Sequence, residues 1–185
     1  MKNILQTFCL LAVLLLCQCQ KEKDPSFSIT TEEIGKLKKN SLTRDLELIY
    51  AEDSIVRDTV RGNFGSNASK IQIFEKGGKK LLTLTPNSDS IPTIENILIN
   101  DPRFTTENGI NTQSTFKDIK EKYAIKKIIT SLNNVLILLK DSDIYFTIDK
   151  KELPENLRYK TNTNIEEVQI PDTAKIKYMM IGWDS

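Results

Sequence analysis

The chain has 185 residues, enough for one domain, and its 39% apolar, 28% charged and 7% aromatic side chains are typical of a polar-surfaced globular protein rather than a disordered chain. Lys2 is the only charged residue before Cys19, so 25 bases balance 25 acids in the remainder of the sequence. Because neither a basic surplus nor a basic stripe is visible, the charge pattern argues against a nucleic-acid-binding protein.

The N-terminus predicts a secretory signal peptide over residues 1–18. Lys2 precedes an apolar run over residues 8–16, and the chain turns polar at Gln18. A run of about ten apolar residues is too short to span a bilayer core of ~30 Å, which needs about 20 residues. Its length matches the apolar segment of a cleavable signal peptide.

The end of this segment carries the first resemblance. Leu16-Cys17-Gln18-Cys19 resembles the lipobox of bacterial lipoproteins, with Gln18 in place of the usual small residue. The resemblance implies cleavage before Cys19 and acylation of its thiol, and several acyl chains hold a protein stably on a membrane. Cys17 is the alternative lipidation site, because Leu14 lies three residues before it. An ordinary secreted protein with two incidental thiols is the remaining alternative.

The next residues favour Cys19 over Cys17. Gln20-Lys21-Glu22-Lys23-Asp24 resembles the export signal of surface-exposed lipoproteins of the Bacteroidota, which directly follows the lipidated cysteine. The resemblance implies a lipid-anchored protein of the outer membrane that is exported to the cell surface, and a periplasmic orientation stays open. Residues 19–26 are then the lipidated cysteine and a tether, and residues 27–185 form one domain.

An internal repeat organises this domain. Its two copies cover about residues 27–102 and 103–172, and a final strand follows over residues 176–181. Ser41 and Ser114 are predicted N-caps of the two equivalent helices, because a serine hydroxyl can accept an unpaired backbone N–H. Four pieces match in the same order: residues 30–32 with 105–107, 41–51 with 114–124, 71–84 with 135–148, and 94–99 with 165–170.

The repeat predicts an α+β fold. Two helix-strand-strand-strand pseudo-repeats form antiparallel sheet, with the helices on one face and one shared hydrophobic interior. Residues 101–119 resemble a pattern in small envelope lipoproteins and secreted domains of unknown function, which implies a fold and no activity. Tandem repeats of this kind also resemble the beta-lactamase-inhibitor protein and outer-membrane assembly lipoproteins, and this is a likeness of fold alone.

The inventory of reactive side chains is small. The chain contains no histidine, and cleavage before Cys19 leaves no free thiol, so Ser–His and Cys–His catalysis and a structural zinc site are excluded. We therefore expect no metal and no cofactor. The loop carboxylates, Asp53, Asp101 and Asp143 among them, are predicted to be solvated turn residues.

The C-terminal strand supplies the one candidate binding patch, made by Tyr178, Met180 and Trp183, although such residues more often close a core. Together these features predict a membrane-anchored, non-catalytic binding or envelope module with a protein or glycan partner. The alternatives are a carboxylate-based hydrolase and an inhibitor or assembly module.

Overall fold

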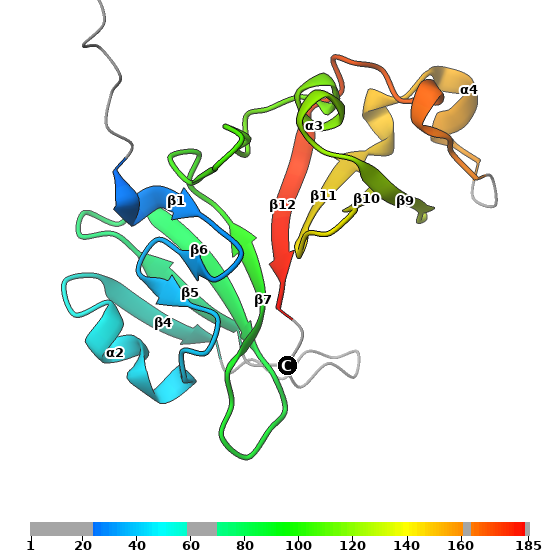
Figure 1. Cartoon of the computed structure of the whole chain (residues 1–185). Coiled ribbons are helices and arrows are strands. Elements are labelled where there is room, and N and C mark those ends of the chain that lie inside the picture. Colours follow the sequence, from blue (N-terminus) through cyan, green and yellow to red (C-terminus); the bar gives the residue numbers. More distant parts are fainter. Residues whose placement is uncertain (1–23, 59–69, 161–163, 184–185) are drawn as a thin grey trace, which may run out of the picture.

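The computed structural model describes residues 24–58, 70–160 and 164–183. The predicted signal peptide and both candidate lipidation sites, Cys17 and Cys19, lie outside these residues. Within the described part of the chain, no helix is long and apolar enough to cross a membrane. The chain forms a strand-rich α+β fold with two sheets, which confirms the predicted class (Figure 1).

The larger sheet has eight strands, and every neighbouring pair is antiparallel. Its order is β4-β5-β6-β7-β12-β11-β10-β9, so the strands of the N-terminal half lie on one side and those of the C-terminal half on the other. β7 and β12 join the halves, with Ile99 opposite Met179. The strands are β4 (Ser54–Asp58), β5 (Lys70–Phe74), β6 (Lys80–Pro86), β7 (Ile94–Ile99), β9 (Ile125–Thr130), β10 (Asn134–Leu139), β11 (Ile144–Asp149) and β12 (Ile176–Gly182).

Both predicted hairpins are confirmed. β5 pairs with β6, with Ile71 opposite Leu84, and β10 pairs with β11 in the same antiparallel sense. The first hairpin turns at Gly77 and Gly78, whose φ angles of 111° and 89° lie in the region that favours glycine. The second turns beside Asp141, which has a φ of 54°. Turn chemistry and strand patterning therefore agree at both positions.

The smaller sheet holds the N-terminus of the described domain against the middle of the chain. Its order is β3-β2-β1-β8, and β1 and β8 are parallel, with Ile29 opposite Thr106. β8 contains part of the matched piece 105–107, whereas residues 30–32 lie between β1 and β2 and form no strand. The strands are β1 (Ser28–Ile29), β2 (Glu33–Ile34), β3 (Leu37–Lys38) and β8 (Thr105–Thr106).

The helices are short and start later than predicted. Ser41 is not an N-cap, because its hydroxyl accepts the Lys38 N–H and the first helical turn begins at Thr43. In the second half the cap is Thr115 rather than Ser114, and Asp118 completes a capping box with it. The helical segments are η1 (Pro25–Phe27), η2 (Thr43–Asp45), α2 (Leu46–Ile49), α3 (Phe116–Lys122), η3 (Lys150–Glu152), α4 (Glu155–Arg158) and η4 (Glu167–Gln169).

The prediction that the fourth pair of matched pieces forms two equivalent strands is wrong. Residues 94–99 form β7, but residues 165–170 contain the 3₁₀ turn η4, and Val168 is 88% exposed. The Gln169 side chain accepts the Glu166 N–H, which fixes the backbone in a turn. In the sheet, the strand that corresponds to β7 by position is β12.

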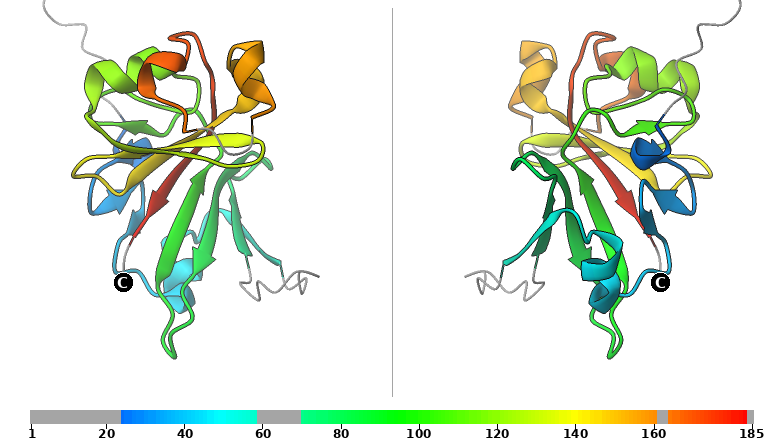
Figure 2. Two further views of the ribbon diagram at one scale, coloured as in Figure 1. Left: turned by 90° about the vertical axis from the view of Figure 1, so that its right-hand side faces the viewer. Right: turned by 90° about the vertical axis from the view of Figure 1, so that its left-hand side faces the viewer.

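One hydrophobic core serves both halves, as predicted. Alternate residues of the central strands point to it, for example Ile97 in β7, Ile137 in β10 and Met179 in β12, and all three are fully buried. The opposite side of the sheet bears partly exposed residues such as Leu98 and Leu136. Figure 2 shows α2 and α3 at opposite ends of the molecule.

Candidate functional site

A groove of about 910 Å³ lies beside the smaller sheet. Five parts of the chain form its walls: the N-terminal turn η1, the turn between β2 and β3, the segment that follows α2, the β5–β6 hairpin and the segment before β8. Its lining is rich in charged and aromatic side chains, which are Asp24, Phe27, Lys36, Tyr50, Glu52, Asp53, Glu75, Lys76 and Phe104.

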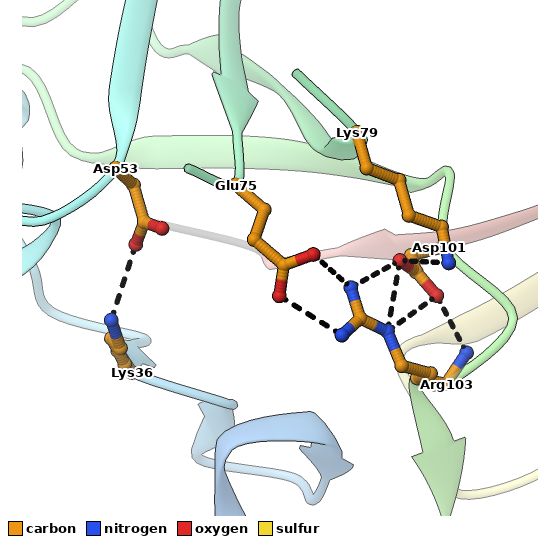
Figure 3. Close-up of polar contacts among 6 residues, drawn as sticks. All are labelled: Lys36, Asp53, Glu75, Lys79, Asp101 and Arg103. Carbon is orange, nitrogen blue, oxygen red and sulfur yellow. Dashed lines mark hydrogen bonds and ion pairs between the residues drawn. The ribbon is translucent and has the colours of Figure 1, made fainter. Parts of the chain in front are cut away.

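A buried carboxylate lies next to this groove. Asp101 follows β7 and is 0% exposed, which corrects the prediction of a solvated turn residue. The Arg103 guanidinium donates to both of its oxygens, from Nε at 3.1 Å and from Nη2 at 2.7 Å, and the Arg103 backbone N–H donates at 2.9 Å. Lys79 adds an ion pair at 3.0 Å (Figure 3). Every buried oxygen of this carboxylate is therefore paired, as burial of a charge requires.

Arg103 connects this carboxylate to the wall of the groove. Its two terminal nitrogens bind the two oxygens of Glu75 in the hairpin at 2.9 and 2.7 Å, in the bidentate geometry that suits a guanidinium (Figure 3). The guanidinium carbon also lies 4.1 Å from the centre of the Phe27 ring. Phe27 in turn packs edge-on against Phe104. One side chain thus fixes the N-terminal turn, the hairpin and the end of β7 relative to one another.

These contacts hold both carboxylates in the ionised form. Burial would raise the pKa of Asp101, but the hydrogen bonds from Arg103 and Lys79 outweigh it and lower the pKa to about 2. The hydrogen bonds from Arg103 likewise lower the pKa of Glu75. Neither carboxylate holds a proton near neutral pH, so neither can serve as a general acid.

A second ion pair forms the opposite wall. Lys36 donates to Asp53 at 3.1 Å, and the Asp53 side chain is only 9% exposed, which again corrects the prediction of a solvated turn (Figure 3). Tyr50, which is 3% exposed, lies under Lys36, whose ammonium is 6.0 Å from the ring centre. Burial, and secondarily the charge of Asp53, raise the pKa of Tyr50, so its hydroxyl stays protonated.

The Tyr50 hydroxyl is the unusual polar group of this wall. It is buried, yet it has no hydrogen-bond partner among residues 24–58, 70–160 and 164–183. A buried hydroxyl without a partner costs about 1–3 kcal/mol, and such groups in native proteins call for an explanation. The Tyr50 side chain lines the groove, so a ligand whose polar atom reached the hydroxyl would supply the missing partner.

The structure separates the three residues of the predicted binding patch. Trp183 is 2% exposed and belongs to the hydrophobic core, so it closes the core and is not part of a surface patch. Tyr178 is 43% exposed and Met180 is half-buried, and both lie on the other side of β12. Asp143, the third loop carboxylate, forms an ion pair with Lys39 at 2.9 Å. In the described ranges, no group of three or more acidic or thiol side chains is placed to hold a metal ion.

Comparison with known proteins gives a likeness of fold. No protein-family model and no curated protein sequence matches the chain. The crystal structure of the uncharacterized protein yfeY from Escherichia coli superimposes with a TM-score of 0.54 at 13% sequence identity. The match covers 84% of this chain and 99% of that one. At this identity the likeness concerns the fold alone.

Proposed function

We propose that the chain is a lipid-anchored envelope protein that acts as a non-catalytic binding module, with the groove beside the smaller sheet as its binding site. The partner is a polar molecule or protein segment that hydrogen-bonds the Tyr50 hydroxyl. That buried and unsatisfied hydroxyl, on the wall of a groove of about 910 Å³, is the observation that carries the proposal.

The electrostatics of the groove favour binding over acid–base chemistry. A carboxylate-based hydrolase needs one carboxyl group that stays protonated near neutral pH. The pKa of Glu75 is lowered by Arg103, and Asp53 is occupied by Lys36. Side chains fixed by ion pairs form a rigid polar surface, which suits recognition because little conformational freedom is lost on binding.

The anchor is proposed on sequence grounds, from the lipobox-like segment that ends at Cys19. The test is membrane fractionation of cells that produce wild-type protein, Cys19→Ala or the control Cys17→Ala, followed by protease treatment of whole cells. We expect Cys19→Ala alone to leave the membrane fraction, and wild-type protein to be cleaved from outside. Recovery of Cys19→Ala in the membrane fraction at the wild-type level would contradict the anchor.

The groove is tested by crosslinking in intact cells. A photo-crosslinking amino acid at Lys76, an exposed residue of the groove, should give a discrete adduct, and the same amino acid at Lys126, an exposed residue of β9, should not. Tyr50→Phe should weaken the adduct, because the partner loses its hydrogen bond to the hydroxyl. Equal adducts from both positions, or turnover of a substrate by the purified protein, would contradict a non-catalytic groove.

We further propose that the fold arose from two equivalent units, each a short helix followed by an antiparallel run of strands. The order of the large sheet supports this, because β4-β5-β6-β7 is mirrored by β12-β11-β10-β9. The matched hairpins also align without a gap, so that Ile71 corresponds to Val135 and Leu81 to Tyr145.

A further inference from the structure

A second cavity, of about 460 Å³, lies in the C-terminal half, and half of its lining residues are bases. The turn between β9 and β10, the turn η3 and the end of α4 form it. One of its bases, Lys177, is neutralised by Asp149 at 2.9 Å. The other three, Lys150, Lys151 and Arg158, form no ion pair with any acid of the described ranges.

Lys150 is the strongest evidence that this cavity is a built site. The residue is 3% exposed, and its ammonium donates to the Lys160 backbone carbonyl at 2.7 Å, its one partner in the part of the chain that the structure describes. An ammonium has three donors, and its burial is costly unless an opposite charge lies nearby. The cavity beside Lys150 offers space for such a charge.

Arg158 presents the geometry that recognises an oxyanion. Its Nε donates to the Leu153 carbonyl at 2.7 Å, which fixes the guanidinium, while its two terminal nitrogens have no partner among the described residues. A guanidinium held in this way offers a fork that matches two oxygens of one anion. The ammonium of Lys151, on the adjacent turn, adds a third positive charge.

The rim of the cavity is apolar. Leu132 is 69% exposed and Tyr159 is 83% exposed, and both line the cavity. Exposed apolar side chains beside a group of bases fit a ligand that joins a charged group to a less polar body. The positive charges of Lys150, Lys151 and Arg158 around one cavity favour a compact oxyanion, which a phosphate group provides.

We propose that this cavity binds the phosphate group of a small molecule or of a phospholipid headgroup, with Lys150, Lys151 and Arg158 as its ligands. The site is separate from the groove around Tyr50. It does not depend on the lipid anchor, because all of its residues belong to the folded domain.

The test uses the purified full-length chain and two arms. Calorimetric titration with inorganic phosphate and with glycerol 3-phosphate measures binding of a free phosphate. Cosedimentation with phosphatidylglycerol vesicles, compared with phosphatidylcholine vesicles, measures binding of a headgroup. Because every variant carries the same N-terminal segment, differences between variants report on the cavity alone.

The decisive variant is Lys151→Glu/Arg158→Glu, and the matched control is Lys126→Glu/Lys127→Glu, which changes the net charge equally on exposed positions of β9. Loss of charge-assisted hydrogen bonds should weaken phosphate binding at least about tenfold in the first variant and leave it unchanged in the second. Specific loss in the titration arm supports a free phosphate, and specific loss only with phosphatidylglycerol supports a headgroup. Absence of binding in both arms, or equal weakening in both variants, overturns the proposal.

Discussion

Replacement of Arg103 by methionine should destabilise the fold more than any other single change of an exposed charge. The Arg103 side chain is 38% exposed, but its guanidinium pairs with the fully buried Asp101, binds Glu75 and covers the Phe27 ring. Methionine keeps most of the aliphatic stem and removes the charge, so the change isolates the polar contacts. The matched control is Arg44→Met, since Arg44 is 71% exposed and lies 3.9 Å from Asp45.

The size of the effect follows from the buried carboxylate. Removal of one partner from a buried ion pair costs about 3–5 kcal/mol. Lys79 and one backbone N–H remain on Asp101, which lowers the cost, and the lost contact with Phe27 adds about 0.5–1 kcal/mol. We expect the free energy of unfolding to fall by about 3 kcal/mol in Arg103→Met and by at most about 0.5 kcal/mol in Arg44→Met.

The pH dependence gives an independent check. The folded-state pKa of Asp101 is lowered from 3.8 to about 2, so its contribution to stability is complete above 3.8 and is lost as the pH falls through about 2. At about 1.4 kcal/mol per pKa unit, that contribution is about 2 kcal/mol. Urea unfolding at neutral pH and at several acidic values should therefore show the difference between wild type and Arg103→Met shrinking on acidification. A loss below about 1 kcal/mol at neutral pH, or a difference independent of pH, would refute this account of Asp101.

Three further predictions use stability measurements. Gly35→Ala should lower the free energy of unfolding by about 3 kcal/mol, because a Cβ would lie 2.3 Å from a backbone oxygen at a φ of +56°. Gly109→Ala should lower it by only about 1 kcal/mol, because Gly109 has a φ of +85° but open space around the added Cβ. Equal losses in urea titrations would contradict the steric argument. Trp183→Ala should lower the free energy of unfolding by about 4 kcal/mol and Tyr178→Ala by less than about 1 kcal/mol, since Trp183 is in the core and Tyr178 is 43% exposed. A larger loss for Tyr178→Ala in thermal unfolding would contradict the assignment of Trp183 to the core. Lys150→Met should raise the free energy of unfolding by about 1 kcal/mol in phosphate-free buffer, because it removes a buried ammonium that has no acidic partner among the described residues. A marked loss of stability would show that the lysine serves the fold.

The hairpins were predictable because their signals are local. A Gly-Gly pair between two β-rich runs specifies the turn at Gly77, and the runs alternate in polarity as half-buried strands do. The segment over residues 165–170 has apolar residues at the positions that match Ile94, Ile97 and Ile99 of β7, yet it forms a turn. There the Gln169 side chain binds the Glu166 backbone, and the position in the large sheet that corresponds to β7 is taken by β12. The spacing of apolar residues does not reveal whether a side chain will bind the backbone or whether another segment will take the strand position.

The buried carboxylate was not predictable from its own neighbourhood. Asn100-Asp101-Pro102 is a typical turn sequence, and most turn aspartates face solvent. Asp101 is buried because Arg103 lies two residues later and Lys79 comes from a hairpin that the chain leaves about twenty residues earlier. The Asp-Pro-Arg spacing allows the contact between Asp101 and Arg103, but nothing in the sequence predicts the contact between Asp101 and Lys79. The same holds for Tyr50, whose unsatisfied hydroxyl depends on what surrounds it in space.

The balanced charge of the chain limits what the basic cavity can bind. Lysines and acids alternate along the sequence, which contains no basic stripe, and bases gather locally where η3 and α4 meet the turn between β9 and β10. A local excess can hold one compact anion, whereas a long polyanion needs many contacts along its length. Binding at this cavity should therefore saturate at one phosphate group per chain, with a shallower dependence on salt than a nucleic-acid-binding protein shows. The charge balance that argues against nucleic acid is thus compatible with a phosphate site, because the two depend on charge at different length scales.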